Sequence, residues 1–257
     1  ASGGGGGLPS LAGLTAFGFK GGKGPGLVGT FYDFKQDTEH KPTPAAVPGV
    51  SGINAHVAIL SEFFRKGWDV SVLNRYYHAP DKVIAPQIMM PSMPSQAAPD
   101  AFGVGKEIKG LRWAVHYKGT VVAPKTGTYR FVGLGDDILI VSFDNDTVLA
   151  SLWPQGSMIP TFSAMFPSLK QESTPGVDKG VRFYATTGKW FHVDAGKSYQ
   201  MQVICSEAYG GSSGYELMIQ EKDDPQWKAF QLMQGVKLPD KKPSKLSAAD
   251  PVLFKSR

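Results

Sequence analysis

Residues 111–143, LRWAVHYKGTVVAPKTGTYRFVGLGDDILIVSF, decide the fold of this chain. From Trp113 to Tyr117, large apolar residues occupy every second position, which is the pattern of a half-buried strand. Gly119 and residues 124–127 predict turns, and a second alternating strand follows them. A third, apolar strand is expected from Ile138 to Phe143. Successive strands joined by short turns indicate an antiparallel β-sheet.

Two adjacent carboxylates, Asp136 and Asp137, separate the second expected strand from the third. Charged groups between apolar strands are costly unless water solvates them or a cation neutralises them. Their position therefore predicts a binding site at a strand end, and not a simple turn.

This arrangement resembles the PA14 family, a β-sandwich domain of bacterial toxins, glycosidases and fungal adhesins. The most specific match runs from Tyr129 to Asp137, and weaker matches are Gly26–Asp33 and Gly188–Tyr199. The similarity covers roughly residues 26–37 and 110–221, and it indicates a bacterial-type variant of the domain.

The resemblance implies a mainly β fold, a PA14-like antiparallel β-sandwich with one helix-containing insertion and with N- and C-terminal extensions. We expect a glycine-rich arm over residues 1–25 and the sandwich over residues 26–221, with its insertion at about residues 38–110. Residues 222–257 form a basic extension, with eight Lys or Arg against four Asp. The 31 glycines and 19 prolines of the chain suit a turn-rich β fold.

One helix is predicted inside the insertion, over residues 53–66. Its apolar residues recur at helical spacing, and Gly67 follows where a C-terminal cap is expected. His56 is interpreted as an ordinary residue of one helix face. Residues 76–110 are rich in proline and methionine, and we expect them to wrap the sandwich as irregular structure.

In the sugar-binding branch of the PA14 family, two adjacent aspartates joined by a cis peptide bind Ca²⁺, which coordinates two hydroxyls of a sugar. The resemblance places Asp136 and Asp137 in this role. Carboxylates suit Ca²⁺, which takes six to eight hard oxygen ligands. That branch adds an asparagine from a later loop, and Glu207 stands at its position here. The alternative is that the aspartates only end a strand and bind backbone, without metal.

The sugar would contact Asp136, Asp137 and a glycine-rich loop that contains Tyr209, Gly210 and Gly211. Trp153, Trp190 and Tyr209 could also stack on sugar rings, although aromatic residues of a sandwich commonly belong to the core.

Composition narrows the function further. A formal charge of +5, concentrated in the tail, does not make the dense basic face that nucleic-acid binding requires.

The single cysteine, Cys205, cannot form an intrachain disulfide and is expected to be a buried thiol. We expect no membrane span, because proline and glycine interrupt the longest uncharged run, residues 147–169. A start without Met fits a secreted or cell-surface protein after removal of a signal peptide; an expression scar is the competing explanation.

No catalytic constellation is predicted. A GxGxxG match at residues 24–29 precedes an expected strand, and a GxSxG match at 210–214 also leads into a strand, whereas both motifs need a following helix. We therefore expect a non-catalytic module that binds carbohydrate. The alternative is a structural subunit of an extracellular filament or surface assembly, a homo-oligomer or polymer held together by its terminal extensions.

Overall fold

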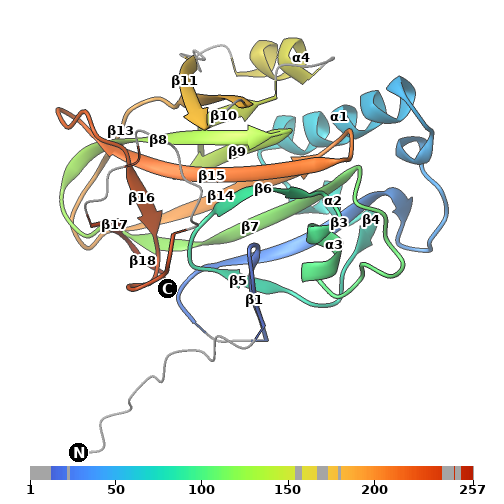
Figure 1. Cartoon of the computed structure of the whole chain (residues 1–257), viewed down its shortest axis with the longest axis horizontal. Coiled ribbons are helices and arrows are strands. Elements are labelled where there is room, and N and C mark those ends of the chain that lie inside the picture. The colour runs from blue at the N-terminus through green and yellow to red at the C-terminus, as the bar shows by residue number, and fades with distance from the viewer. Residues whose placement is uncertain are drawn as a thin grey trace, which may run out of the picture.

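The computed structural model describes residues 13–21, 24–153, 158–166, 173–178, 181–238, 246 and 250–256. Two β-sheets lie face to face, and a long helix covers the outer side of one of them (Figure 1). The strands are antiparallel except for one parallel pair near the C-terminus. The predicted mainly β sandwich is thus confirmed.

The larger sheet has the order β1-β2-β5-β3-β7-β14-β9-β10, with β4 beside β3 and β18 beside β7. Its described strands are β1 (Leu14–Thr15), β2 (Gly18–Lys20), β3 (Leu27–Asp37), β4 (Tyr76–His78), β5 (Val83–Ala85), β7 (Trp113–Val122), β9 (Ile138–Phe143), β10 (Asp146–Leu152), β14 (Ser198–Glu207) and β18 (Lys255–Ser256).

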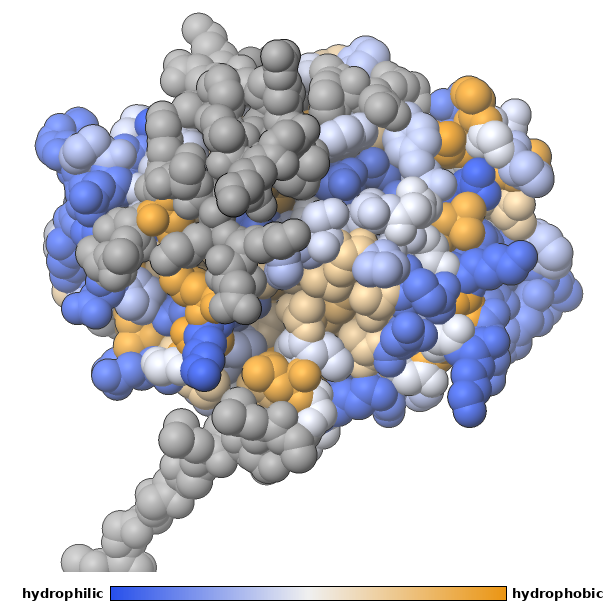
Figure 2. All heavy atoms as spheres, in the orientation of Figure 1, coloured by the Kyte–Doolittle hydropathy of each residue, from blue (hydrophilic) through white to orange (hydrophobic). Residues whose placement is uncertain are grey.

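The smaller sheet has the order β11-β12-β8-β15-β16-β17, with β13 beside β8 and β6 beside β15. Its described strands are β6 (Met89–Pro94), β8 (Gly127–Asp136), β11 (Ser173–Asp178), β12 (Val181–Thr187), β13 (Phe191–Val193), β15 (Ser212–Glu221), β16 (Lys228–Gln231) and β17 (Val252–Leu253). Figure 2 shows apolar side chains near the centre and lower edge of the face turned to the viewer.

The main core lies between the sheets and contains the alternating side chains that predicted β7. Trp113, Val115 and Tyr117 are fully buried there, and Phe131 of β8 belongs to the same cluster. Burying each side chain of this size stabilises the fold by about 1.5–3 kcal/mol. The intervening residue Ala114 faces a second core on the other side of the sheet.

This second core lies beneath α1 (Val50–Arg65). The helix ends as its sequence predicts: Gly67 takes a φ of +71°, and its N–H donates to the carbonyl of Phe64 at 3.0 Å, while the N–H of Trp68 donates to Phe63. These bonds form a Schellman cap. The other helices are η1 (Pro44–Ala46), α2 (Val70–Leu73), α3 (Ala97–Ala101) and α4 (Met158–Met165). No helix among the described residues has the length and apolar character to cross a membrane.

Two local expectations were wrong. Gly119 does not mark a turn: it lies inside β7, paired with Met201, where a side chain would meet Leu27 at 3.0 Å. The close approach of Leu27 therefore explains this glycine better than a turn does. Residues 76–110 are not irregular throughout, because they supply β4, β5, β6 and α3. The two prolines of β6 argued against a strand in the sequence, but a strand at the edge of a sheet tolerates proline.

The two ends of the described chain join the sandwich. Residue Phe17, between β1 and β2, is 1% exposed and packs against Trp113, while β2 pairs with β5 of the same chain. At the other end, β16 pairs with β15 and β18 pairs with β7. Residues 1–12 of the predicted arm and most of 239–249 lie outside the described residues.

Candidate functional site

Asp136 and Asp137 lie where the chain passes from one sheet to the other. Asp136 ends β8 of the smaller sheet and pairs with Gly214, and Asp137 immediately precedes β9 of the larger sheet. The peptide bond between them is cis, as the resemblance implies. Asp137 is 3% exposed, whereas Asp136 is half-buried.

The loop after β14 folds over these two residues. The Oδ2 atom of Asp137 accepts hydrogen bonds from the backbone N–H groups of Ala208, at 2.8 Å, and Tyr209, at 3.1 Å. Oε1 of Glu207 accepts from Tyr209 at 2.9 Å and from Gly210 at 2.6 Å. Asp137 and Glu207 therefore share one N–H donor, and the loop amides hold both carboxyl groups in place.

Glycine shapes the tip of this loop. Gly210 and Gly211 have φ angles of +87° and +96°, a region that side chains disfavour. A side chain at Gly210 would also meet Leu111 at 3.2 Å. The loop can therefore turn back sharply enough for its amides to reach the carboxylates.

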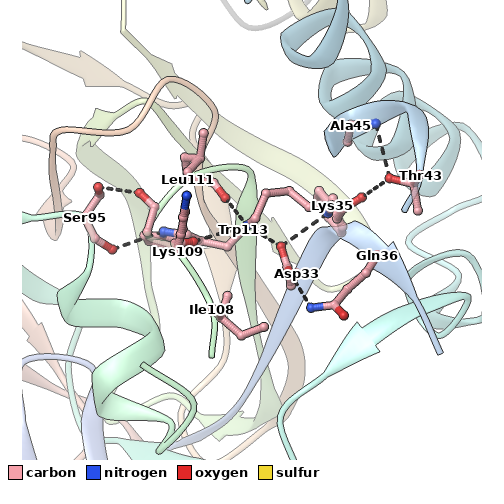
Figure 3. Close-up of polar contacts among 12 residues, drawn as sticks. Asp33, Lys35, Gln36, Thr43, Ala45, Ser95, Ile108, Lys109, Leu111 and Trp113 are labelled. Atoms are coloured by element: carbon pink, nitrogen blue, oxygen red, sulfur yellow. Dashed lines mark hydrogen bonds and ion pairs between the residues drawn. The ribbon is translucent and has the colours of Figure 1, made fainter. Parts of the chain in front are cut away.

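Figure 3 shows polar contacts among residues of β3, of the segment before β7 and of β7 itself. Lys35 pairs with Asp33 and donates to the carbonyl of Leu111 at 2.6 Å, so β3 holds the segment that leads into β7. Ser95 donates its N–H to Gly211 at 2.9 Å, and its carbonyl accepts from the Trp113 indole at 3.2 Å. The loop is thereby tied to β7.

Electrostatics at the site are unfavourable without a counter-charge. Burial raises the pKa of Asp136 to about 7, and the neighbouring Asp137 adds to the effect. Burial likewise raises the pKa of Glu207 to about 10, with Asp137 the next cause. Oε2 of Glu207 is buried without a hydrogen-bond partner. Asp136 and Glu207 therefore favour their protonated forms unless a cation lies beside them.

The donor chemistry fits a hard cation such as Ca²⁺, because every side-chain ligand offered is an oxygen. However, within the described ranges no group of three or more His, Cys, Asp or Glu side chains is arranged to hold a metal ion. Glu207 directs Oε1 to the loop amides, which leaves only Oε2 for a ligand.

The predicted sugar-contacting residues are partly brought together. Tyr209 and Gly210 are half-buried beside the acid pair, and Gly211 is exposed. Trp153 is also adjacent, since its N–H donates to the carbonyl of Asp137 at 2.7 Å. Trp190 does not lie near the acid pair. It precedes Phe191, which pairs with Tyr129 at the opposite end of β8. Seven residues of strand separate that position from Asp136, about 23 Å at the usual rise.

Sequence reasoning missed Ser95 and Arg112. Arg112 takes a φ of +53° before β7, and its guanidinium donates to the carbonyl of Gly49 at 3.3 Å. Ser95 lies in the proline- and methionine-rich segment, 116 positions before Gly211, and no local pattern indicates their contact. His56 lies on the buried face of the helix, and its Nε2 is hydrogen-bonded to the Ser206 hydroxyl at 2.9 Å.

No protein-family model and no curated protein match this chain. Solved structures do. The PA14 domain of the antifreeze protein MpAFP is 14% identical with a TM-score of 0.43, covering 79% of this chain and 85% of that one. A PA14 sugar-binding domain from an RTX adhesin is 14% identical with a TM-score of 0.43, covering 81% and 96%.

The A domain of epithelial adhesin 6 from Candida glabrata, solved with Galβ1-3GlcNAc, is 14% identical with a TM-score of 0.40, covering 88% of this chain and 95% of that one. A β-glucosidase from Kluyveromyces marxianus matches over 17% of its own length, at a TM-score of 0.39. PA14 domains are thus among the solved structures to which this chain is similar, and the two-sheet architecture is seen in the chain itself. Likenesses at these TM-scores carry no argument about ligand or activity.

Proposed function

We propose that this chain is a non-catalytic, secreted or cell-surface module that binds carbohydrate. The sugar would contact Asp136 and Asp137 together with Tyr209, Gly210 and Gly211. Ca²⁺ would be held by the two aspartates, with Oε2 of Glu207 as a further ligand. When bound, the ion supplies positive charge and free coordination positions that sugar hydroxyls can occupy.

One observation carries this proposal: three acidic side chains meet under a glycine-rich loop, and one buried carboxylate oxygen has no partner. Burial of Asp136 and Glu207 disfavours their charged forms, so a cation beside them would stabilise the ionised site. A cation converts the same arrangement into a binding site. Asp136 is half-buried and Gly211 is exposed, so both are within reach of a ligand from solvent.

A glycan array tests the proposal with full-length protein in millimolar Ca²⁺ and again in EGTA. We expect retention on a defined set of glycans in Ca²⁺, loss in EGTA, and loss in Asp137→Asn. Asp144→Asn is the matched control, because Asp144 is an exposed aspartate of the turn after β9. Retention that ignores both EGTA and Asp137→Asn would reject the site.

The assembly role is the second candidate, and one feature favours it. β1 is the outermost strand of the larger sheet, it pairs with β2 only among the described strands, and Leu14 is 46% exposed. Such an edge can accept a strand from another copy. Light scattering on the full-length chain tests this: a concentration-dependent mass above that of one chain supports assembly, and a constant mass of one chain rejects it.

A further inference from the structure

A second concave site lies away from the acid pair, on the outer face of the larger sheet where the cover of α1 and α2 ends. It is a groove of about 660 Å³, a size that holds small ligands elsewhere. Strands β3 and β7 form its floor, α2 forms one wall, and β4 with the following loop forms the other. Its polar lining consists chiefly of Thr30, Asn74, His78, Lys82, His116 and Lys118.

Strand register explains why these side chains converge. Across β3 and β7, Thr30 pairs with His116, and the neighbouring pair of the same face places Val28 beside Lys118. Residues two apart on a strand point to the same face, so all four side chains line one surface. Lys82 immediately precedes β5, which pairs with β3 at the adjacent Gly29. The sheet therefore builds the floor of the groove, and Lys82 is placed beside it by the start of β5.

The lining carries positive charge without any carboxylate. Neither Lys82 nor Lys118 forms an ion pair within the part of the chain that the structure describes. The neighbouring acids are engaged elsewhere: Asp81 pairs with Lys20, and Asp69 accepts two hydrogen bonds from Ser71.

Hydrogen-bond donors complement the two ammonium groups. Oδ1 of Asn74 accepts from the Tyr32 hydroxyl at 3.1 Å, which leaves the amide N–H₂ of Asn74 to donate. The Thr30 hydroxyl can donate as well. His116 is 4% exposed; burial lowers its pKa to about 4, and the Lys118 charge adds to that effect. The ammonium groups of Lys82 and Lys118, with no carboxylate in the lining, therefore give the groove a positive field that an anion would offset.

We propose that this groove binds the phosphate or sulfate group of a small ligand, independently of the Asp136–Asp137 site. Two lysines match the double negative charge of such a group, and the amide and hydroxyl donors match its additional oxygens. Val28 of β3 and Val70 of α2, which are 40% and 37% exposed, offer apolar contacts to the rest of the ligand.

Histidine ring signals in proton NMR give a direct test, because the chain has five histidines and two of them line the groove. We expect inorganic phosphate, sulfate and glucose 6-phosphate to shift the His78 and His116 signals with saturation. His40 and His192 are exposed outside the groove and should stay unchanged. Equal shifts at His40 and His192 would show that the added salt changes all histidine signals nonspecifically, and they would overturn the proposal.

Three variants test the role of the two lysines. Replacing both Lys82 and Lys118 by alanine should weaken binding at least tenfold, whereas Lys106→Ala, at an exposed lysine elsewhere, should change it less than twofold. Lys118→Gln keeps the aliphatic stem and tests charge alone. Tighter binding of glucose 6-phosphate than of phosphate identifies an esterified ligand, and equal binding identifies the free oxyanion. Unchanged affinity in the double variant, or equal binding of glucose, would refute the site.

Discussion

At the scale of single residues, Glu207 carries the largest electrostatic cost of the acid site. It is fully buried beside Asp137, and its Oε1 already serves two loop amides. Glutamine preserves that acceptor and cannot ionise, so it avoids the cost of protonating a buried carboxylate at neutral pH. Because burial disfavours the charged form, we expect Glu207→Gln to stabilise the protein in EGTA by about 1–3 kcal/mol.

The same substitution should abolish or strongly reduce stabilisation by Ca²⁺, because it removes one anionic ligand. Chemical denaturation in EGTA and in millimolar Ca²⁺ measures both effects. Glu216→Gln provides a half-buried control on β15. A Glu207→Gln protein that is less stable in EGTA yet responds normally to Ca²⁺ would show that Glu207 only braces the loop.

The buried ring of His116 should make the free energy of unfolding depend on pH. Its pKa falls from 6.5 to about 4, chiefly because the ring is buried. Between these values the unfolded state binds a proton that the folded state does not, so stability is complete above about pH 6.5 and is lost as the pH falls toward 4. The loss approaches 1.4 kcal/mol per pH unit, about 3 kcal/mol in total.

His116→Gln should flatten that part of the acid limb, since glutamine does not titrate and can still bond Gln202. Urea denaturation at half-unit steps from pH 7 to pH 4 measures the slope. His192→Gln, at an exposed histidine, should leave the slope unchanged. An identical acid limb in wild type and His116→Gln would contradict the burial argument.

At the scale of elements, the hairpin of β1 and β2 can be tested as a brace of the sandwich. The Phe17 ring packs edge-on against Trp113 and Phe102, and its carbonyl accepts from the Tyr117 hydroxyl at 3.0 Å. Phe17→Ala should therefore cost about 3–5 kcal/mol. Leu14→Ala, at the exposed end of the hairpin, should cost little, and denaturation curves compare the two. Equal small effects would mean that the hairpin does not support the fold.

The strands that sequence could predict are those with clear alternation. Trp113–Tyr117 indicated β7, and the apolar run 138–143 matches β9 residue for residue. Alternation fails for β6, whose sequence MMPSMP carries two prolines, and for β1 and β2, which are too short to show a period. Their pairing depends on distant partners, which no local pattern encodes.

Some residues of the acid site could likewise be predicted from the sequence, and others could not. The unusual cost of two adjacent carboxylates between strands singled out Asp136 and Asp137 from sequence, and the resemblance brought in Glu207. Ser95 could not be found, because its role depends on tertiary contacts with Gly211 and Trp113. The phosphate-type groove could not be found either, since Lys82 and Lys118 meet only through the pairing of β5, β3 and β7.

At the scale of the whole molecule, bracing and assembly make different demands on the N-terminal segment. Residues 14–20 join the larger sheet of their own chain. Deleting residues 1–12 leaves that hairpin intact, whereas deleting residues 1–20 removes it. We predict that the shorter deletion weakens self-association without changing the melting temperature, and that the longer deletion lowers the melting temperature as well. Light scattering and thermal unfolding separate these effects, and an unchanged single-chain mass throughout would contradict assembly.

The central claim, that the acid pair is a cation-dependent binding site, is tested most directly by titrating EGTA-treated protein with Ca²⁺ in a calorimeter. We predict one saturable site per chain in the wild type and in Asp144→Asn, and none in Asp137→Asn. Stabilisation should follow, about 2.7 kcal/mol when free Ca²⁺ is a hundred times its dissociation constant. Absence of heat at millimolar Ca²⁺ in the wild type, or equal binding by Asp137→Asn, would contradict the account.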